Sequence, residues 1–441
     1  MATRRQFQLL GQRRFLPYFL TQFSGAFNDN LFKNLLLLVI TYRAGGLMGL
    51  SVDLVVNLAA FLFILPYFLF SGIAGQLADR FEQAVLIRRV KALEVGIMVV
   101  AATGLLMGWY EVLLLLLFLT GVQSTFFGPV KYAILPRVLA ERELVGGNGL
   151  VGMGTFVAIL LGTIAAGPIM VLPGALWIGA GAVLSVAVLG YLAARSIPAT
   201  MPTGPPVREK LSLFRETLAI LRLARERRIV LLGILAISWF WLLGAAYLTQ
   251  FPNFARTVLN GDETVVSLLL VLFIIGISIG AMLCETLNRG AVSLRLVPFA
   301  ALGLSAFGTD LYFAVPPVTS SPDWWVLLTD SRFYRLEADL LGIGLSGGLF
   351  IVPLYAFIQN ETPPDRRARI IAALNVINAL FMVISAMLGM VLLGIIGLSI
   401  PIFLLMLSLV SLPVTLGLLW RLHQHRRTLP DDPGEKLSKH R

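Results

Sequence analysis

A short polar segment interrupts the first long apolar stretch of the chain. Residues 27–33 read FNDNLFK, so that Asp29 and Lys33 lie one helical turn apart. Asn28 and Asn30 flank the carboxylate on either side. In an apolar setting a carboxylate binds an ammonium group or a proton, and a lysine ammonium binds phosphate or carboxylate groups. The pattern indicates either an Asp29–Lys33 ion pair that neutralises itself or the polar wall of a cavity.

Other polar side chains occur at the ends of later apolar stretches or within them. Lys131 lies in residues 128–136, GPVKYAILP, where a lysine can extend to the membrane interface or face a binding site. Glu361 has a comparable place, at which an ordinary loop acid is the simpler explanation. Asn375 and Asn378 are one turn apart and either line one side of a helix or join packed helices. We predict the following substrate-binding residues: Asn28, Asp29, Asn30, Lys33, Lys131, Glu361, Asn375 and Asn378.

A charged motif follows the second apolar stretch. It comprises Gly75, Asp79 and Arg80, and then Arg88 and Arg89. Because a charge network can favour one of two conformations by a few kcal/mol, we expect this group to control conformational switching and not substrate choice.

The sequence offers little material for catalysis or metal binding. The three histidines lie at positions 423, 425 and 440, and Cys284 is the single cysteine. We therefore predict no metal site, no cofactor and no enzymatic activity. Four acidic residues in or near apolar stretches remain, and we expect the first to join the charged motif through Arg80 or Arg88. These residues are Glu94, Asp310, Glu337 and Asp339.

The elements that must position these residues are long apolar helices. Hydrophobic residues make up 57% of the 441 residues and charged residues 13%, whereas soluble domains are about half apolar and a quarter charged. A helix needs roughly 20 apolar residues to cross a bilayer. We therefore predict an all-α integral membrane protein. The expected spans are 15–40, 53–74, 86–108, 112–128, 145–170, 174–194, 229–251, 264–285, 294–315, 334–358, 369–393 and 396–420.

A linker divides these spans into two sets of six. Prolines exclude a regular helix from the first part of this linker. Residues 209–228, which follow, can form an amphipathic helix on the membrane surface. The predicted organisation is a six-helix bundle in 1–195, a linker in 196–228, a second bundle in 229–421 and a disordered tail in 422–441. Short segments recur in the same order in both halves, which suggests a duplicated unit. The matched segments are 75–79 with 281–285, 129–135 with 353–358, and Asn148 with Asn375 and Asn378.

The basic residues predict the orientation. The termini and the loops after even-numbered spans hold about 30 of the 35 lysines and arginines. The opposite side holds Arg43, Arg256, Arg332 and Arg335, and only Lys33 remains inside a span. The positive-inside rule then places both termini in the cytoplasm. The net charge of +11 is explained by a basic face against anionic lipid, so that no nucleic-acid partner is expected.

The six-plus-six arrangement with a central linker resembles the major facilitator superfamily. The charged motif is similar to that superfamily's loop motif, although Glu82 replaces a usual glycine. Segments 27–33, 128–136 and 148–167 resemble the bacterial lysophospholipid transporter (LplT-type) family. Segments 353–356 and 375–382 are closest to a variant in which the transporter is fused to an acyltransferase and an acyl-carrier-protein ligase, but this sequence ends without such an enzyme domain.

This resemblance implies alternating access and inward movement of lysophospholipids, chiefly lysophosphatidylethanolamine, across the bacterial inner membrane for re-acylation. It also matches Lys131 to the family's headgroup-site lysine. Two other functions stay open. One is a proton-coupled exporter of drugs or small polar solutes, in which Asp29 carries the proton. The other is a membrane docking protein for a cytoplasmic acyltransferase or acyl-ACP synthetase, bound through the basic linker and the tail.

Overall fold

Long helices form at all the predicted spans. The computed structural model describes residues 6–40, 52–200, 213–288, 291–317 and 322–428, and these contain no strand. Within them, each predicted span coincides with one long helix, so the predicted fold class is confirmed. The helices of the first half are α2 (Leu16–Val39), α3 (Val52–Arg80), α4 (Gln83–Met107), α5 (Tyr110–Ala133), α7 (Leu144–Val171) and α8 (Ala175–Arg195). Those of the second half are α10 (Arg228–Thr257), α11 (Glu263–Asn288), α12 (Val297–Ala314), α14 (Tyr334–Glu361), α15 (Arg367–Gly389) and α16 (Ile400–Thr428).

Short elements connect the long helices. They are η1 (Leu9–Gly11), α6 (Leu135–Val138), η3 (Glu141–Glu143), α9 (Leu213–Glu226), α13 (Trp324–Thr329) and a π-helical turn, η4 (Met390–Ile395).

The membrane character of the helices follows from their length and composition. Among the described residues, 11 helices are long and apolar enough to cross a membrane. The exception among the predicted spans is α2, which is 24 residues long but carries the polar segment around Asp29. Because these polar side chains are directed into the protein, α2 is a long helix whose composition alone would not identify it as a span.

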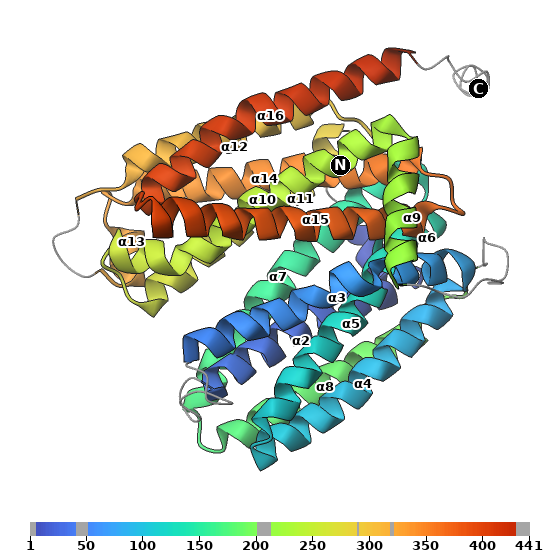
Figure 1. Ribbon diagram of the computed structural model, residues 1–441, viewed down its shortest axis with the longest axis horizontal. Helices are drawn as coiled ribbons and strands as arrows, with labels where there is room; N and C mark the ends of the chain where they lie inside the picture. Colours follow the sequence, from blue (N-terminus) through green and yellow to red (C-terminus); the bar gives the residue numbers. More distant parts are fainter. Residues whose placement is uncertain (1–5, 41–51, 201–212, 289–290, 318–321, 429–441) are drawn as a thin grey trace.

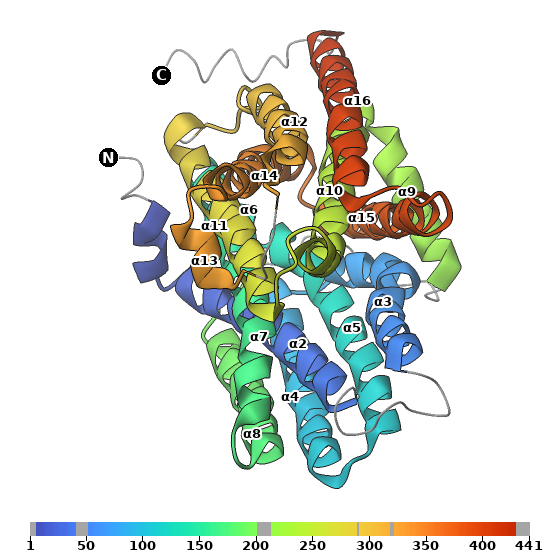
Figure 2. The ribbon, with the colours of Figure 1, turned by 90° about the vertical axis from the view of Figure 1, so that its left-hand side faces the viewer.

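The long helices are arranged in two groups (Figures 1 and 2). In the first, α2 packs on α7 and α8, and α3 packs on α5. In the second, α14 packs on α11 and α12, and α10 packs on α15 and α16. The groups meet through α7 with α11 and through α3 with α15. Glycines permit the close contacts within them: a Cβ at Gly162 on α7 would lie only 2.3 Å from the carbonyl oxygen of Phe27 on α2.

Helix α9 of the linker crosses both groups at one end of the bundle (Figure 1). It contacts α3, α10 and α15. Ile220 and Ala224 on its inner face are buried, whereas Leu218 is exposed. Gly72 on α3 lies directly beneath α9, because a Cβ there would be 2.5 Å from the amide nitrogen of Thr217. The predicted amphipathic helix is therefore present. Part of its apolar surface packs on the protein, and Leu218 faces outward.

The C-terminal end differs from the prediction. Helix α16 continues to Thr428, into the segment 422–441 for which a disordered tail was predicted. The apolar pattern had suggested an end near residue 420, but helix geometry persists through the polar residues that follow. The rest of the tail, 429–441, and the proline-rich residues 201–212 lie outside the described residues.

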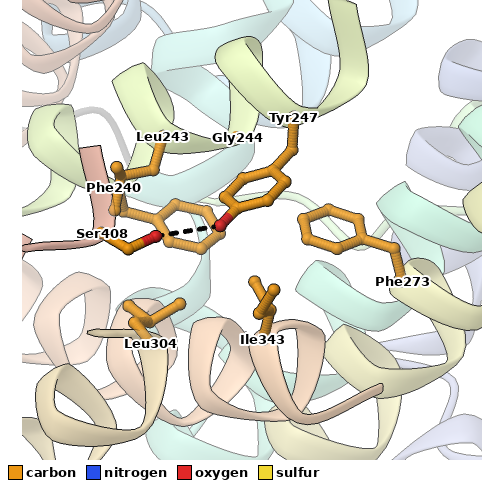
Figure 3. Close-up of a pocket in the computed structure, with 8 residues that line it drawn as sticks. All are labelled: Phe240, Leu243, Gly244, Tyr247, Phe273, Leu304, Ile343 and Ser408. Atoms are coloured by element: carbon orange, nitrogen blue, oxygen red, sulfur yellow. Dashed lines mark hydrogen bonds between the residues drawn. The ribbon is translucent and has the colours of Figure 1, made fainter. Parts of the chain in front are cut away.

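The second group contains a large apolar core around α10, α11 and α14. A small void of about 10 Å³ lies between Phe240, Phe273 and Ile343 (Figure 3). The hydroxyl groups of Tyr247 and Ser408 meet at its edge at 3.1 Å. The void is about the size of one water molecule, so the second group contains no room for a larger ligand at this point.

The orientation can be tested by labelling. We expect single cysteines at Thr203, which lies outside the described residues, and at Pro322 to react from opposite sides of the membrane, because the Lys/Arg asymmetry places the linker in the cytoplasm. The measurement is reaction with an impermeant thiol reagent in intact cells and in inverted vesicles, in a Cys284→Ala background. Cys284 is buried, so the wild-type protein, in which it is the single cysteine, is the control for background labelling. Reaction of both positions from one side would contradict the twelve-span topology.

Candidate transport site

A cavity of about 430 Å³ lies between the two groups of helices. Six predicted binding residues line it, and they come from three helices: Asp29, Asn30 and Lys33 from α2, Lys131 from α5, and Asn375 and Asn378 from α15. Asn28 and Glu361 are not among the lining residues. A cavity of this size is typical of small-molecule sites.

Asp29 lies on the wall formed by the first group. The Ser124 hydroxyl donates to one carboxylate oxygen at 2.5 Å, and the other oxygen has no hydrogen-bond partner in the described structure. Lys33 does not pair with it. Its ammonium donates to the Asn30 side-chain oxygen at 3.1 Å and lies 5.7 Å from the centre of the Phe63 ring. The described residues therefore show no self-neutralising Asp29–Lys33 ion pair, and the carboxylate retains an oxygen for another donor.

Lys131 lies in the last turn of α5, which continues through Pro129 to Ala133. The predicted span ended at residue 128, but the helix extends further and carries the lysine inward. The ammonium donates to the Thr155 hydroxyl at 2.6 Å and lies 5.3 Å from the centre of the Tyr132 ring. Thr155 in turn donates to Gln22 at 2.9 Å. Lys131 is therefore directed into the bundle and does not extend to the membrane interface.

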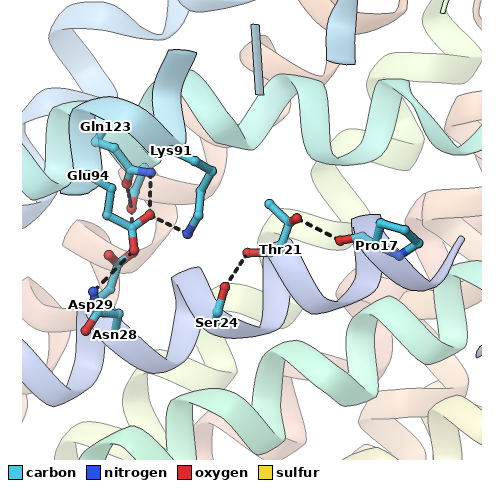
Figure 4. A network of polar contacts seen from close by, with 9 residues as sticks. Pro17, Thr21, Ser24, Asn28, Asp29, Lys91, Glu94 and Gln123 are labelled. Atoms are coloured by element: carbon cyan, nitrogen blue, oxygen red, sulfur yellow. Dashed lines mark hydrogen bonds and ion pairs between the residues drawn. The ribbon is translucent and has the colours of Figure 1, made fainter. Parts of the chain in front are cut away.

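A buried polar network stands behind the cavity wall (Figure 4). Lys91 and Glu94, one turn apart on α4, form an ion pair in which each side chain is 1% exposed. Glu94 also accepts hydrogen bonds from Gln123 at 3.1 Å and Asn28 at 3.2 Å. Gln123 accepts from Ser124 at 3.2 Å, which continues the network toward Asp29.

Three expectations are corrected by this network. Asn28 was expected on the cavity wall, but its amide faces Glu94 within the first group. Glu94 was expected to join the charged loop motif, but its partners lie at the centre of the helix bundle. Lys91 was counted with the loop residues, yet it is a buried lysine inside α4 and also lines the cavity. Lys91 and Glu94 pair with each other, and neighbouring amides bind Glu94, so both charges can be buried. Hydropathy alone could not reveal these partners.

The second group supplies a neutral wall. Tyr132 on α5 and Tyr355 on α14 stack with ring centres 4.3 Å apart, so that the two halves meet at the cavity. Each is followed by an alanine in the repeated segments 129–135 and 353–358, although Tyr132 lies three residues after Pro129 and Tyr355 two after Pro353. The residue before Tyr355 is Leu354, where the first half has Lys131. Since every charged residue that lines the cavity belongs to the first group, the duplicated unit has become asymmetric in charge.

The remaining acidic residues lie away from the cavity. Glu361 ends α14, and its backbone carbonyl accepts a hydrogen bond from Arg227. Asp310 pairs with Arg335 at 2.5 Å. Asp339 is buried within the second group. Glu361 therefore contacts Arg227 at the end of α14 and does not line the cavity.

The charged motif joins the two groups at the end predicted to be cytoplasmic. Asp79, at the end of α3, accepts hydrogen bonds from the backbone N–H groups of Ala368 at 2.7 Å and Arg369 at 3.2 Å. The Arg369 guanidinium also donates to it at 3.0 Å. The carboxylate therefore caps the positive first turn of α15. Gly75 permits this approach, because a Cβ there would lie 2.6 Å from that of Ala372.

The arginines of the motif have separate surroundings. Arg88 donates to the carbonyl of Ile197 at 2.9 Å, at the start of the linker. Arg89 is exposed, and Arg80 is half-buried beside α9. The contacts of Asp79 with Ala368 and Arg369 thus link the motif to the other half of the protein.

A second link lies between α7 and α14. The amide of Asn148 donates to Gln359 at 2.8 Å, and the amide of Gln359 donates back at 3.0 Å. Both side chains are buried. Each amide satisfies the other only while the halves are together, so separation must expose both to water or leave them unpaired.

Comparison with known proteins accounts for this arrangement. The model of the family described as Major Facilitator Superfamily matches residues 18–386. The chain belongs to the major facilitator superfamily. It is accordingly a multi-pass membrane transporter and not an enzyme.

Curated relatives and solved structures within this superfamily are similar to the chain. It is 27% identical to the lysophospholipid transporter LplT of Enterobacter sp. (strain 638), over 77% of this chain and 78% of the relative. It is 28% identical to LplT of Salmonella newport (strain SL254), over 78% and 79%. The human organic anion transporter MFSD10 has a TM-score of 0.70 at 14% identity, over 92% and 99%. The transporter FucP in its outward conformation has a TM-score of 0.68 at 14% identity, over 93% and 99%. At such identities the structures support the fold alone.

Because major facilitators alternate between two access states, the Asp79 link predicts a kinetic phenotype. We expect Asp79→Asn to slow transport by about threefold to thirtyfold, since an amide caps the helix less strongly and forms no ion pair with Arg369. Relative uptake of different substrates should remain as in the wild type, because Asp79 is remote from the cavity lining. The measurement is initial uptake of two competing substrates at matched expression. A changed preference at a normal rate would contradict a switching role.

Proposed function

We propose that this protein is a lysophospholipid transporter that moves lysophosphatidylethanolamine and related lysolipids from the outer to the inner leaflet of the bacterial inner membrane. The observation that carries the proposal is the cavity wall on which Asp29 and Lys131 both face one space. The curated relatives named as lysophospholipid transporters support the same substrate class.

The chemistry of the substrate matches this wall. Lysophosphatidylethanolamine carries an ammonium and a phosphate, and each loses its hydration when the headgroup enters hydrocarbon. In the proposed complex the second oxygen of Asp29, which is buried without a hydrogen-bond partner in this conformation, becomes accessible and accepts from the ammonium. Lys131 exchanges its hydrogen bond with Thr155 for the phosphate, and Lys33 is the alternative cation. The headgroup thereby keeps charge-matched partners while it crosses the membrane.

The apolar part of the cavity suits the single acyl chain. Phe63, Ile159 and Met382 are among the lining residues that carry no charge. An acyl chain in contact with such side chains, or with lipid between the helices, avoids exposure to water. The cavity thus offers the amphiphile one charged and one apolar surface, which a site for a fully polar solute does not need.

The proposed orientation makes this conformation compatible with inward transport. With both termini in the cytoplasm, the Asp79 link and the Asn148–Gln359 pair close the cytoplasmic end of the cavity. We propose that this arrangement receives substrate from the outer leaflet. Separation of these contacts, with closure at the opposite end, then releases it to the inner leaflet. Rocking of the two halves around a fixed central site is typical of transporters built from repeats.

The test is uptake of labelled lysophosphatidylethanolamine by vesicles that contain the purified protein, with and without proton and sodium gradients. We expect saturable uptake that unlabelled lysolipid inhibits. Absence of uptake under all gradients, together with proton-driven efflux of a polar solute that excess lysolipid does not inhibit, would favour the exporter instead.

A further inference from the structure

Two asparagines of α15 line the same cavity but differ in their bonding. The side-chain oxygen of Asn378 accepts a hydrogen bond from Ser238 on α10 at 2.7 Å, and Asn378 is 5% exposed. It serves helix packing within the second group. Asn375, one turn earlier, is half-buried and makes no side-chain hydrogen bond among the described residues. Its amide is therefore available to a ligand.

The position of this free amide is closely defined. A Cβ built on Gly128 of α5 would lie 2.7 Å from the side-chain nitrogen of Asn375. A larger residue at 128 would displace the amide from its present position against the opposite helix. Gly128 is one turn before Lys131 on α5, so Asn375 approaches the first group on the same side of the helix as that lysine.

Other polar lining groups are less available. Thr155 is engaged with Lys131 and Gln22, and Ser124 is engaged with Asp29. The side-chain nitrogens of Gln22 and Trp241 have no partner, but both atoms, like the second oxygen of Asp29, are buried in this conformation. The accessible amide of Asn375 is thus a neutral donor and acceptor opposite the charged wall.

We propose that Asn375 recognises the free glycerol hydroxyl that distinguishes a monoacyl from a diacyl phospholipid. This inference rests on the proposed function. In a 1-acyl lysophospholipid the hydroxyl is carried by the carbon next to the one that bears the phosphate ester, so a phosphate held at Lys131 brings it close to the Asn375 side chain. The amide then both donates to the hydroxyl and accepts from it. In a diacyl lipid this position is an ester, which cannot donate and adds a second chain beside Gly128.

The experiment compares lysophosphatidylethanolamine with its analogue that lacks the glycerol hydroxyl, in vesicles containing the purified protein. For the wild type we expect an apparent KM about threefold to tenfold lower for the hydroxylated lipid, as for one net hydrogen bond. Asn375→Leu should raise the KM of this lipid to that of the analogue and leave the analogue unchanged. Asn375→Ala serves the same purpose where the larger side chain prevents folding.

Two further variants separate recognition from structure. Asn378→Leu removes the neighbouring amide that bonds to Ser238, so it should affect both lipids equally and retain the preference. Gly128→Ala displaces the Asn375 amide without removing it and should reduce the preference. A preference that persists in both Asn375 variants overturns the assignment of the hydroxyl to Asn375. A wild-type protein that transports neither lipid overturns the proposed function itself.

Discussion

Replacement of Asp29 by asparagine is expected to abolish most uptake of lysophosphatidylethanolamine. The carboxylate has one oxygen bound to Ser124 and one without a partner. In the proposed complex that second oxygen receives the substrate ammonium. A hydrogen bond between charged groups contributes about 1.5–3 kcal/mol, so its loss should lower initial uptake at subsaturating lipid by about tenfold to a hundredfold.

The same variant should discriminate between headgroups. Lysophosphatidylglycerol has no amine to bind the carboxylate, so its uptake should change by no more than about threefold, near the lower limit for one neutral hydrogen bond. The measurement is initial uptake of both lipids at matched membrane expression. Glu111→Gln, at an exposed position in the first turn of α5, controls for loss of a carboxylate elsewhere. Equal loss of both lipids in Asp29→Asn would instead assign Asp29 to structure or to ion coupling.

The second large effect is expected for Lys131→Ala. Both lipids carry a phosphate, so uptake of both should fall by about a hundredfold. The substrate then loses a charged partner, and its phosphate remains desolvated in the cavity. Asp29 also loses one of the positive charges that line the cavity with it.

The control for this prediction is Lys33→Ala on the same wall. The Lys33 ammonium is already bound to Asn30 and lies over the Phe63 ring, so its removal should have the smaller effect. Elution of each purified variant as a single symmetric peak would show that folding is retained. Full activity of Lys131→Ala, with loss of activity in Lys33→Ala, would transfer the phosphate site to Lys33.

The helices could be predicted because lipid imposes a minimum length of apolar sequence on every span. Asp29 and Lys131 could be chosen because an ionised side chain within such a span needs a partner or a cavity. The repeat was visible in the segments that carry Tyr132 and Tyr355, although nothing in them indicates that the two rings stack.

The partners of these residues could not be predicted, because they come from distant helices. Asp79 contacts the first turn of α15, and only the packing of α3 on α15 brings these segments together. Lys91 and Glu94 resemble loop charges in the sequence, since their distance from the end of a span does not reveal burial. The prediction for Asn28 was wrong for a related reason. Its neighbour Asp29 faces the cavity, but the Asn28 side chain points toward its partner Glu94 on another helix.

The restriction of the cavity charges to one half has a consequence for the energy barrier of the transport cycle. When the halves separate, no ion pair within the cavity has to be broken, because Asp29, Lys33 and Lys131 move together as parts of one body. The cross-half ion pair described here is that of Asp79 with Arg369, whose side chain is 30% exposed. Dissolved salt screens such a contact at the water-accessible end but reaches the interior charges much less. In the proposed orientation this end faces the cytoplasm, so we expect the ionic strength there, more than that of the outside solution, to influence how readily the carrier reorients.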